Sequence, residues 1–174
     1  METLRQKIFA LPSKYFSLEG ICIRPIRDDY DLWYAVVACK LAPGQEEYVN
    51  PAGFSIGRAY LQPENNIPCI IWKDETRIGY IVFRIWCDGI ANSANSWSYY
   101  LDEAWQGHGY GTIAARLAIQ ILKAADGNAS IKLSAEKANC KAHHLYCSIG
   151  FRHEGELDGD DLVYEYKGDP NDLS

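Results

Sequence analysis

A glycine-rich loop constrains the fold of this chain more than any other feature of its sequence: Gln106-Gly107-His108-Gly109-Tyr110-Gly111. It lies between an aromatic segment at 96–102 and a helical pattern over 112–126, so it predicts a strand, a sharp turn and a helix. Glycine permits such a turn and lets backbone N–H groups approach a ligand without a Cβ atom in the way. The first helical turn adds unpaired donors and a positive dipole end, and together these groups favour a pyrophosphate.

The loop matches neither of the two common phosphate-binding motifs. A dinucleotide fingerprint read from Gly107 needs its third glycine where Thr112 stands, and no Lys-Ser/Thr pair follows as it does in a P-loop. Taken alone, the loop also fits a turn that binds no ligand.

A second informative segment spans residues 139–151 and has the spacing of a helix that ends at Gly150. Asn139 and Tyr146 are two turns apart on that helix and therefore share a face. An amide and a phenol on one side favour a ligand there. The alternative is that Tyr146 packs in the core with its hydroxyl bonded to backbone, as a buried tyrosine usually does.

The composition excludes several classes of function. The 174 residues suit one domain, and 17 Lys+Arg against 23 Asp+Glu give a net charge of −6. Binders of nucleic acids and anionic membranes need a basic face, so neither partner is expected. The acidic balance suits a cationic substrate, although solubility alone explains it as well. No apolar run reaches the length of a membrane span, and residues 1–14 lack a signal-peptide pattern.

The six cysteines indicate a reducing compartment. They form no CxxC pair and no recurrent spacing with histidine, so neither a zinc site nor a disulfide framework is expected. Four of them lie in apolar or aromatic surroundings, where a free cysteine acts as a small core residue. We therefore expect a cytoplasmic protein that needs no metal.

Hydrophobic periodicity and turn residues predict strands that alternate with helices only in the second half of the chain. Expected strands span 20–24, 67–72, 77–87, 96–102, 131–133, 151–157 and 162–167; expected helices span 28–40, two short pieces within 45–62, 112–126 and 139–149. Residues 88–95 are predicted as a loop, and Asp158-Gly159 as a tight hairpin turn. This order predicts a mixed sheet rather than a doubly wound parallel one.

Together, the glycine loop and segment 139–151 resemble the two signatures of the GNAT superfamily, the acetyl-CoA-dependent N-acetyltransferases. The acetyl-CoA signature Q/R-x-x-G-x-G/A is matched by Gln106, Gly109 and Gly111. The second signature, N-x-x-A-x-x-L-Y-x-x-x-G-F, is matched at every fixed position from Asn139 to Phe151.

This resemblance covers about residues 20–167 and implies both the fold and the domain organisation. The fold class is α/β (α+β), with a mixed, mostly antiparallel sheet of six to seven strands and about four helices around it. Two parallel strands separate in a V-shaped splay that leaves room for coenzyme A. The whole of 1–174 forms a single N-acetyltransferase domain, with residues 1–19 as an N-terminal extension.

A narrower resemblance, to bacterial spermine/spermidine acetyltransferases, rests on softer motifs. The segment from Gln45 to Glu64, the triplet Asp74-Glu75-Thr76, and Gly79 are similar to that group. It implies a polyamine acceptor, a flexible polycation held by carboxylates and aromatic faces. The implied substrate-binding residues are Glu46, Glu47, Tyr48, Phe54, Glu64 and Trp97. Each of the three glutamates also fits an ordinary exposed charge.

The superfamily resemblance implies how acetyl-CoA binds. Backbone N–H groups of the glycine loop hold the pyrophosphate, and the edge of the preceding strand pairs with the pantetheine arm. A donor near Leu101 stabilises the developing oxyanion, and Asn139 bonds the pantetheine or phosphate arm. The implied cofactor-binding residues are Tyr100, Leu101, Asp102, Gln106, Gly107, His108, Gly109, Tyr110, Gly111, Thr112, Asn139 and Tyr146.

The same resemblance implies a general acid and leaves the base open. Tyr146 protonates the departing thiolate, because an ordinary phenol keeps its proton at neutral pH. Some polyamine acetyltransferases keep a glutamate on the strand before the glycine loop, where this chain has Trp97-Ser98-Tyr99-Tyr100. Glu136 is the nearest substitute, and a water relayed through Ser98 or Glu136 is the alternative. Glu136 also fits a solvated charge at a strand end.

The leading hypothesis is transfer of acetyl from acetyl-CoA to a primary amine, spermidine or spermine above all, by direct attack in a ternary complex. The alternatives are the same chemistry on an aminoglycoside, an amino acid or a protein N-terminus, and a non-catalytic sensor that binds acetyl-CoA. The missing strand carboxylate favours the sensor, and Tyr146 favours the enzyme. The sequence leaves the oligomeric state open, a homodimer included.

Overall fold

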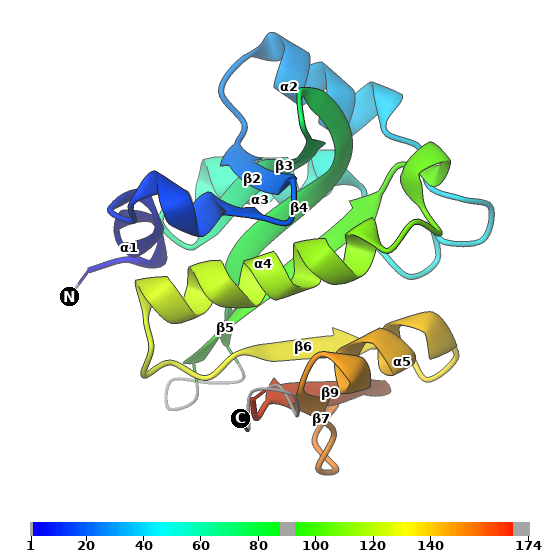
Figure 1. The fold of residues 1–174 in the computed structure, drawn as a ribbon. Helices are drawn as coiled ribbons and strands as arrows, with labels where there is room; N and C mark the ends of the chain where they lie inside the picture. The colour runs from blue at the N-terminus through cyan, green and yellow to red at the C-terminus, as the bar shows by residue number, and fades with distance from the viewer. Residues whose placement is uncertain (1, 88–92, 169–174) are drawn as a thin grey trace.

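The computed structural model describes residues 2–87 and 93–168. Within these residues, the first half of the chain forms a five-stranded antiparallel sheet in the order β1-β2-β3-β4-β5 (Figure 1). Its strands are β1 (Ser17–Leu18), β2 (Ile21–Pro25), β3 (Asn66–Lys73), β4 (Thr76–Cys87) and β5 (Ser93–Leu101). The strands expected over 67–72 and 77–87 are confirmed as β3 and β4, which pair antiparallel as a hairpin that closes at Lys73 and Thr76.

A smaller antiparallel sheet follows in the second half of the chain. β6 (Lys132–Ala135) pairs with β9 (Asp161–Tyr166), which also pairs with β7 (Phe151–Arg152) and β8 (Leu157–Asp158). Gly159, with φ +59°, makes the predicted tight turn between β8 and β9. The predicted mixed fold class is confirmed, but the strands that the sequence places in one sheet are divided between two.

The two sheets meet at one parallel bridge among the described residues, between Asn95 of β5 and Ile131. The Asn95 N–H donates to the carbonyl of Ser130 at 2.8 Å. Past this bridge, within the described ranges, β5 pairs only with β4 and β6 only with β9. The two strands therefore separate toward their carboxyl ends (Figure 1), as the predicted splay requires.

Helices cover both faces of the five-stranded sheet. On one face lies α4 (Tyr110–Ala125), whose buried stripe of alanine, leucine and isoleucine packs on β2 and β5. Beside it lies α1 (Leu4–Phe9), in a segment for which the sequence predicts no element. On the other face, α3 (Ala52–Leu61) packs on β3. α5 (Cys140–Ser148) lies against β7 and the smaller sheet.

Four local predictions differ from the structure. The strand expected over 151–157 is two short strands, β7 and β8, with residues 153–156 between them outside any strand. The helix expected over 28–40 is shorter and changes type: α2 (Asp29–Trp33) is followed by a π-helical turn, η2 (Tyr34–Ala38). The spacing of apolar residues does not distinguish a π-helical turn from an α-helix. The two pieces expected within 45–62 are one helix, α3, which begins directly after Pro51 because the fixed φ of proline suits a helix start. The loop expected over 88–95 is shorter, because Ser93–Asn95 belong to β5, and 88–92 lie outside the described residues.

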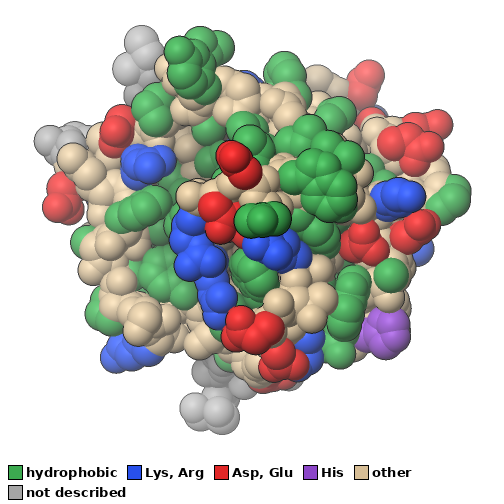
Figure 2. Space-filling view, turned by 90° about the horizontal axis from the view of Figure 1, so that it is seen from above, with side chains coloured by type: hydrophobic (Ala, Val, Ile, Leu, Met, Phe, Trp, Pro, Cys, Tyr) green, Lys and Arg blue, Asp and Glu red, His purple; other side chains and the backbone are tan. Residues whose placement is uncertain are grey.

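The face above α2 carries a mixed surface. Hydrophobic side chains lie between charged groups of both signs (Figure 2), and the exposed hydrophobic ones include Tyr30, Trp33 and Val37. One carboxylate beneath this surface is fully buried. Asp31 accepts a hydrogen bond from Arg77 Nε at 2.9 Å, and Arg77 in turn stacks on the Trp72 ring. This ion pair fastens α2 to the β3–β4 hairpin.

Candidate active site

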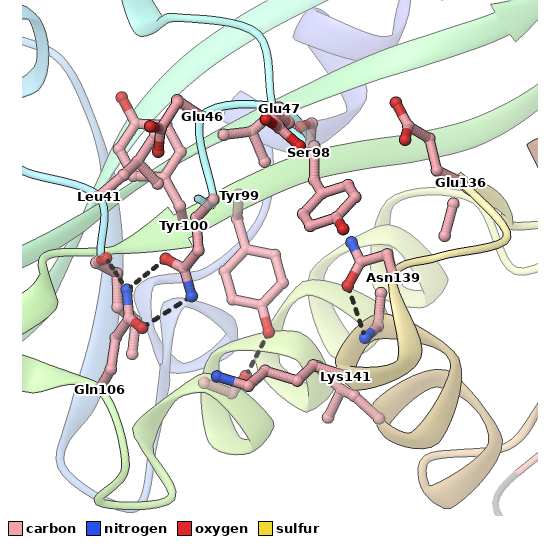
Figure 3. Close-up of a pocket in the computed structure, with 18 of the residues that line it drawn as sticks. Leu41, Glu46, Glu47, Ser98, Tyr99, Tyr100, Gln106, Glu136, Asn139 and Lys141 are labelled. Carbon is pink, nitrogen blue, oxygen red and sulfur yellow. Dashed lines mark hydrogen bonds between the residues drawn. The ribbon is translucent and has the colours of Figure 1, made fainter. Parts of the chain in front are cut away.

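The splay between β5 and β6 opens into a cleft of about 1040 Å³. Its walls come from five places: β5, the loop at 41–51, the glycine loop, the end of β6 and the first turns of α5 (Figure 3). Segments far apart in the sequence therefore meet there.

The glycine loop has the backbone that its sequence predicts. Gly107 and Gly109 have φ values of +79° and +82°, in the left-handed region that favours glycine. A Cβ atom added at either position would meet nothing within 4 Å, so the space outside the loop is open. Gly109 is the N-cap of α4, and no side chain caps that helix start. The unpaired N–H groups of the first turn are available to an anion.

The free edge of β5 forms the floor of the cleft. The Asp102 N–H donates to the Ile78 carbonyl of β4 at 2.9 Å. Because successive residues of a strand point their backbone groups to opposite edges, the N–H and carbonyl of Leu101 face the splay. This places a backbone donor where the sequence predicts the stabilising group for an oxyanion.

A pair of amides ties the loop at 41–51 to the glycine loop. Gln45 Nε2 donates to Gln106 Oε1 at 2.9 Å, and Gln106 Nε2 donates to Gln45 Oε1 at 2.8 Å (Figure 3). Gln106 Nε2 also donates to the Leu101 carbonyl at 2.9 Å. The Tyr99 hydroxyl donates to the Gly111 carbonyl at 3.0 Å. These bonds hold the strand edge, the glycine loop and the start of α4 in fixed relation.

Tyr146 lines the cleft from α5. Its ring packs against Phe151 and Tyr164, with centroid separations of 5.9 and 5.5 Å. Its hydroxyl makes no hydrogen bond with another described residue, contrary to the expectation for an ordinary core tyrosine. Burial raises the pKa of Tyr146 to about 12, although nearby Arg84 opposes the shift. The phenol therefore keeps its proton throughout the neutral range.

The candidates for holding the general base lie on two different walls of the cleft, β5 and the end of β6. Ser98, on β5, and Glu136, after β6, both line the cleft (Figure 3), and Glu136 is exposed. Asn139 lines it as well, but its Oδ1 accepts from the Ala142 N–H at 3.2 Å and so caps α5. The Asn139 Nδ2 group remains to bond a ligand.

Most of the predicted site residues reach the wall of the cleft: Glu46, Glu47, Tyr48, Trp97, Tyr100, Leu101, Gln106, Gly107, Gly109, Gly111, Thr112, Glu136, Asn139 and Tyr146. Three predicted cofactor ligands lie outside it. The Asp102 carboxylate accepts from the Lys40 and Ala104 N–H groups, and His108 stacks on Tyr110 with a centroid separation of 5.8 Å.

Two predicted substrate residues are elsewhere. The structure does not bring Glu64 to the cleft, because its carboxylate accepts from Thr3 Oγ1 at 2.6 Å, beside α1. Phe54, on α3, lines a small side pocket of about 20 Å³ that adjoins the cleft. The side pocket lies between α3 and the strands β4 and β5, and its walls are Asn50, Phe54, Ser55, Arg58, Asn66, Tyr80, Val82, Arg84, Ser98 and Tyr100.

Four residues that sequence reasoning missed take part in the cleft: Gln45, Arg84, Tyr99 and Lys141. Gln45 and Tyr99 act through hydrogen bonds to distant segments, which no local pattern announces. Arg84 interrupts an apolar strand, and this polar residue in a buried pattern is the one available signal.

A second groove, of about 1020 Å³, lies between α1, β2 and α3 and contains none of the predicted site residues. No group of three or more His, Cys, Asp or Glu residues in the described ranges could hold a metal ion. In the same ranges, no helix is both long enough and apolar enough to span a membrane. The predicted site residues therefore gather at the first cleft and not at the second groove.

The sequence model of the acetyltransferase (GNAT) family matches residues 30–151. That range includes the glycine loop, the free edge of β5 and Tyr146. The chain belongs to this family. No curated protein matches the sequence significantly.

Solved structures show the same fold in several members of the family. The aminoglycoside acetyltransferase AAC(6')-Ib in complex with coenzyme A is 18% identical, with a TM-score of 0.69, over 83% of this chain and 92% of that one. Mycobacterium smegmatis RimJ in complex with CoA-disulfide is 19% identical, with a TM-score of 0.60, over 88% and 83%. The ribosomal-protein-S5-alanine acetyltransferase from Vibrio fischeri is 16% identical, with a TM-score of 0.62, over 89% and 97%.

Proposed function

We propose that this GNAT protein transfers the acetyl group of acetyl-CoA to the primary amine of a small acceptor, by direct attack in a ternary complex. The observation that carries the proposal is the alignment, along one cleft, of the open glycine loop, the unpaired edge of β5 and the protonated Tyr146. Each of the three has a separate use in acetyl transfer.

The cleft fits acetyl-CoA by its donors and by its shape. The open space beside Gly107 and Gly109 leaves room for a pyrophosphate against the backbone N–H groups that precede α4. The free edge of β5 offers main-chain donors and acceptors to the amide-rich pantetheine arm, in the manner of strand addition. Lys141, on the wall formed by α5, supplies a positive charge near the phosphate end. The bound acetyl-CoA supplies a thioester, which is an activated acetyl group on a thiol leaving group.

The residues of this chain then serve the transfer in three ways. The Leu101 N–H lies on the splayed edge and stabilises negative charge that develops on the carbonyl oxygen. Tyr146, with its proton retained, donates it to the departing sulfur. A water held by Ser98 or Glu136 takes the proton that the amine loses. The site of amine attack lies between these groups.

The acceptor is the finer part of the proposal. A polyamine is supported by Glu46 and Glu47, which line the cleft, and by Tyr48 beside them, because carboxylates and aromatic faces bind ammonium groups. Glu64 does not support a polyamine acceptor, because its carboxylate bonds to Thr3 outside the cleft. Structures of AAC(6')-Ib with ribostamycin and coenzyme A show that this fold also accepts an aminoglycoside in that protein. A non-catalytic acetyl-CoA sensor is favoured only by the absence of a carboxylate on β5.

Thiol release tests the proposal. The purified protein is incubated with acetyl-CoA and a panel of amines, and free thiol is followed over time, while calorimetry measures the binding of acetyl-CoA. We expect binding, and amine-dependent thiol release that Tyr146→Phe slows by about 100-fold or more. Binding without release for any amine would leave the sensor as the function, and no binding at all would overturn the proposal.

A further inference from the structure

The side pocket behind the cleft has an unusual balance of charge. Two of its ten wall residues are arginines, Arg58 and Arg84, and none is a carboxylate. The other walls supply hydroxyl and amide groups, among them Ser98 and Asn50, which line the main cleft as well. A pocket of this kind, rich in donors and positive charge, suits an anionic group.

Arg84 has no ion-pair partner among residues 2–87 and 93–168. It projects from β4 toward α3, its Nε atom is buried without a hydrogen bond, and its guanidinium forms no ion pair with a described residue. Among the described residues, the guanidinium makes one cation–π contact, in which Arg84 Cζ lies 6.0 Å from the centroid of the Trp86 ring. The half-buried Arg77, on the same strand, is by contrast paired with Asp31. The exposed Asp158 is the one carboxylate that acts on Arg84 electrostatically, from outside the pocket.

An unpaired, largely buried guanidinium is costly to keep. Burial and the neighbouring Arg58 both lower the pKa of Arg84. An arginine nevertheless stays charged in a protein, so the chain bears the cost of desolvation without the gain of an ion pair. A ligand carboxylate would supply that gain, since guanidinium and carboxylate form paired, charge-assisted hydrogen bonds.

The main cleft has the opposite character. Four carboxylates line it, Glu46, Glu47, Glu136 and Asp161, against the cations Arg84 and Lys141. An ammonium group is favoured there, whereas an anion is favoured in the side pocket. The two cavities share Arg84 and Ser98, so a small molecule can reach both.

We propose that the acceptor is a small amine that also carries a carboxylate, with the carboxylate in the side pocket on Arg84 and Arg58 and the amine in the main cleft. This inference rests on the proposed function. The side pocket, at about 20 Å³, holds little more than one water-sized group. It therefore has room for one oxygen of a carboxylate and none for a sugar ring, and its two arginines repel the second ammonium of a polyamine.

The transfer leaves the carboxylate unchanged. The amine nitrogen forms a bond to the acetyl carbon, and the carbon–sulfur bond breaks with its electron pair on sulfur. The ammonium first loses one proton to water through Ser98 or Glu136, so that the neutral amine attacks. The thiolate then receives the proton of Tyr146, and the second proton of the nitrogen restores the Tyr146 hydroxyl. The products are an N-acetylated aminocarboxylate and free coenzyme A.

Matched acceptors test the inference. Each common amino acid is compared with the amine that lacks its carboxylate, for example ornithine with putrescine and lysine with cadaverine, by thiol release from acetyl-CoA. In the wild-type protein we expect kcat/KM to favour the carboxylate-bearing member of at least one pair by about 30-fold or more, the loss that accompanies an unpaired buried charge. In Arg84→Gln this preference disappears, because KM rises for the carboxylate-bearing member of the pair and not for the amine that lacks the carboxylate. Arg58→Gln weakens it by about 3-fold, because Arg58 is exposed.

The controls separate this inference from the proposed function. Arg24→Gln, which removes another arginine stacked on a tryptophan but outside both cavities, should leave the preference intact. Arg84→Lys keeps the charge and should restore part of the preference, and it replaces Arg84→Gln if circular dichroism shows that variant unfolded. If acetyl-CoA binds but no carboxylate-bearing amine is preferred, or if Arg84 variants keep the preference, the acceptor inference is overturned alone. If acetyl-CoA does not bind, both fall.

Discussion

The role of Tyr146 can be tested by removing its hydroxyl oxygen alone. Tyr146→Phe keeps the ring contacts with Phe151 and Tyr164 and removes only the hydroxyl. Loss of a positioned general acid costs about 10²–10⁴-fold in rate, which is about 3–5 kcal/mol in activation free energy. The KM values for acetyl-CoA and the amine should change little, because the lost interaction belongs to the transition state.

The structure also sets the expected effect of this change on stability. A tyrosine hydroxyl that bonds to backbone contributes about 1 kcal/mol to folding. The Tyr146 hydroxyl has no such partner among the described residues, so the free energy of unfolding should be nearly unchanged. Chemical denaturation measures it on the same sample that is used for steady-state kinetics.

The pH profile adds a third readout. A general acid must be protonated, so activity that depends on Tyr146 is lost only as the pH rises through its pKa of about 12. Between pH 7 and 10, no alkaline decline should arise from this residue. A variant that melts early and turns over normally would refute the reasoning, and so would an alkaline limb near pH 8 that is present in the wild type and absent from Tyr146→Phe.

Three further perturbations test the site and the fold. Gly109→Val should weaken acetyl-CoA binding at least 10-fold by calorimetry, because a β-branched residue is strained at φ +82° and projects into the open cradle; Gly57→Ala, in α3 with open space around it, should not. Asp31→Asn should lower the free energy of unfolding by about 2 kcal/mol in urea, since the buried Asp31 loses its charge-assisted hydrogen bond with the half-buried Arg77; a loss below 1 kcal/mol would contradict this. Cys140 and Cys147 are both exposed, but only Cys140 lines the cleft, so coenzyme A should slow alkylation of Cys140 and leave Cys147 unaffected; equal protection of both would place the ligand elsewhere.

The parts of the site that were predictable are those encoded by local backbone geometry. Alternate glycines before a helix require left-handed φ values and an uncapped helix start, and the structure has both at Gly107 and Gly109. The structure places Asn139 one residue before α5, as its N-cap and not on a helix face, but Asn139 and Tyr146 still line one cleft, as their spacing of two turns predicts. Because these rules act within a few residues, one sequence sufficed.

The parts that were not predictable depend on contacts between distant segments. Gln45 and Gln106 are paired across 61 residues, and no periodicity indicates that they meet. Glu64 belongs to the segment that resembles the polyamine acetyltransferases. It lies in the turn after α3, however, where its carboxylate bonds to Thr3 and not into the cleft. Arg84 becomes informative only when α3 is seen to close a pocket over it that holds no acid. The role of a charged residue can be assigned only when its neighbours in the folded structure are known.

The unpaired edge of β5 also bears on how the protein avoids self-association. A row of free N–H and carbonyl groups is a template for a strand from another molecule, and such edges promote aggregation. Here the edge lies at the floor of a cleft, between the glycine loop on one side and α5 on the other. A flat strand of a second chain meets these walls before it can reach the edge, whereas a slender flexible ligand can enter between them. The splay thus admits a slender ligand and prevents a strand of another molecule from pairing with the edge of β5.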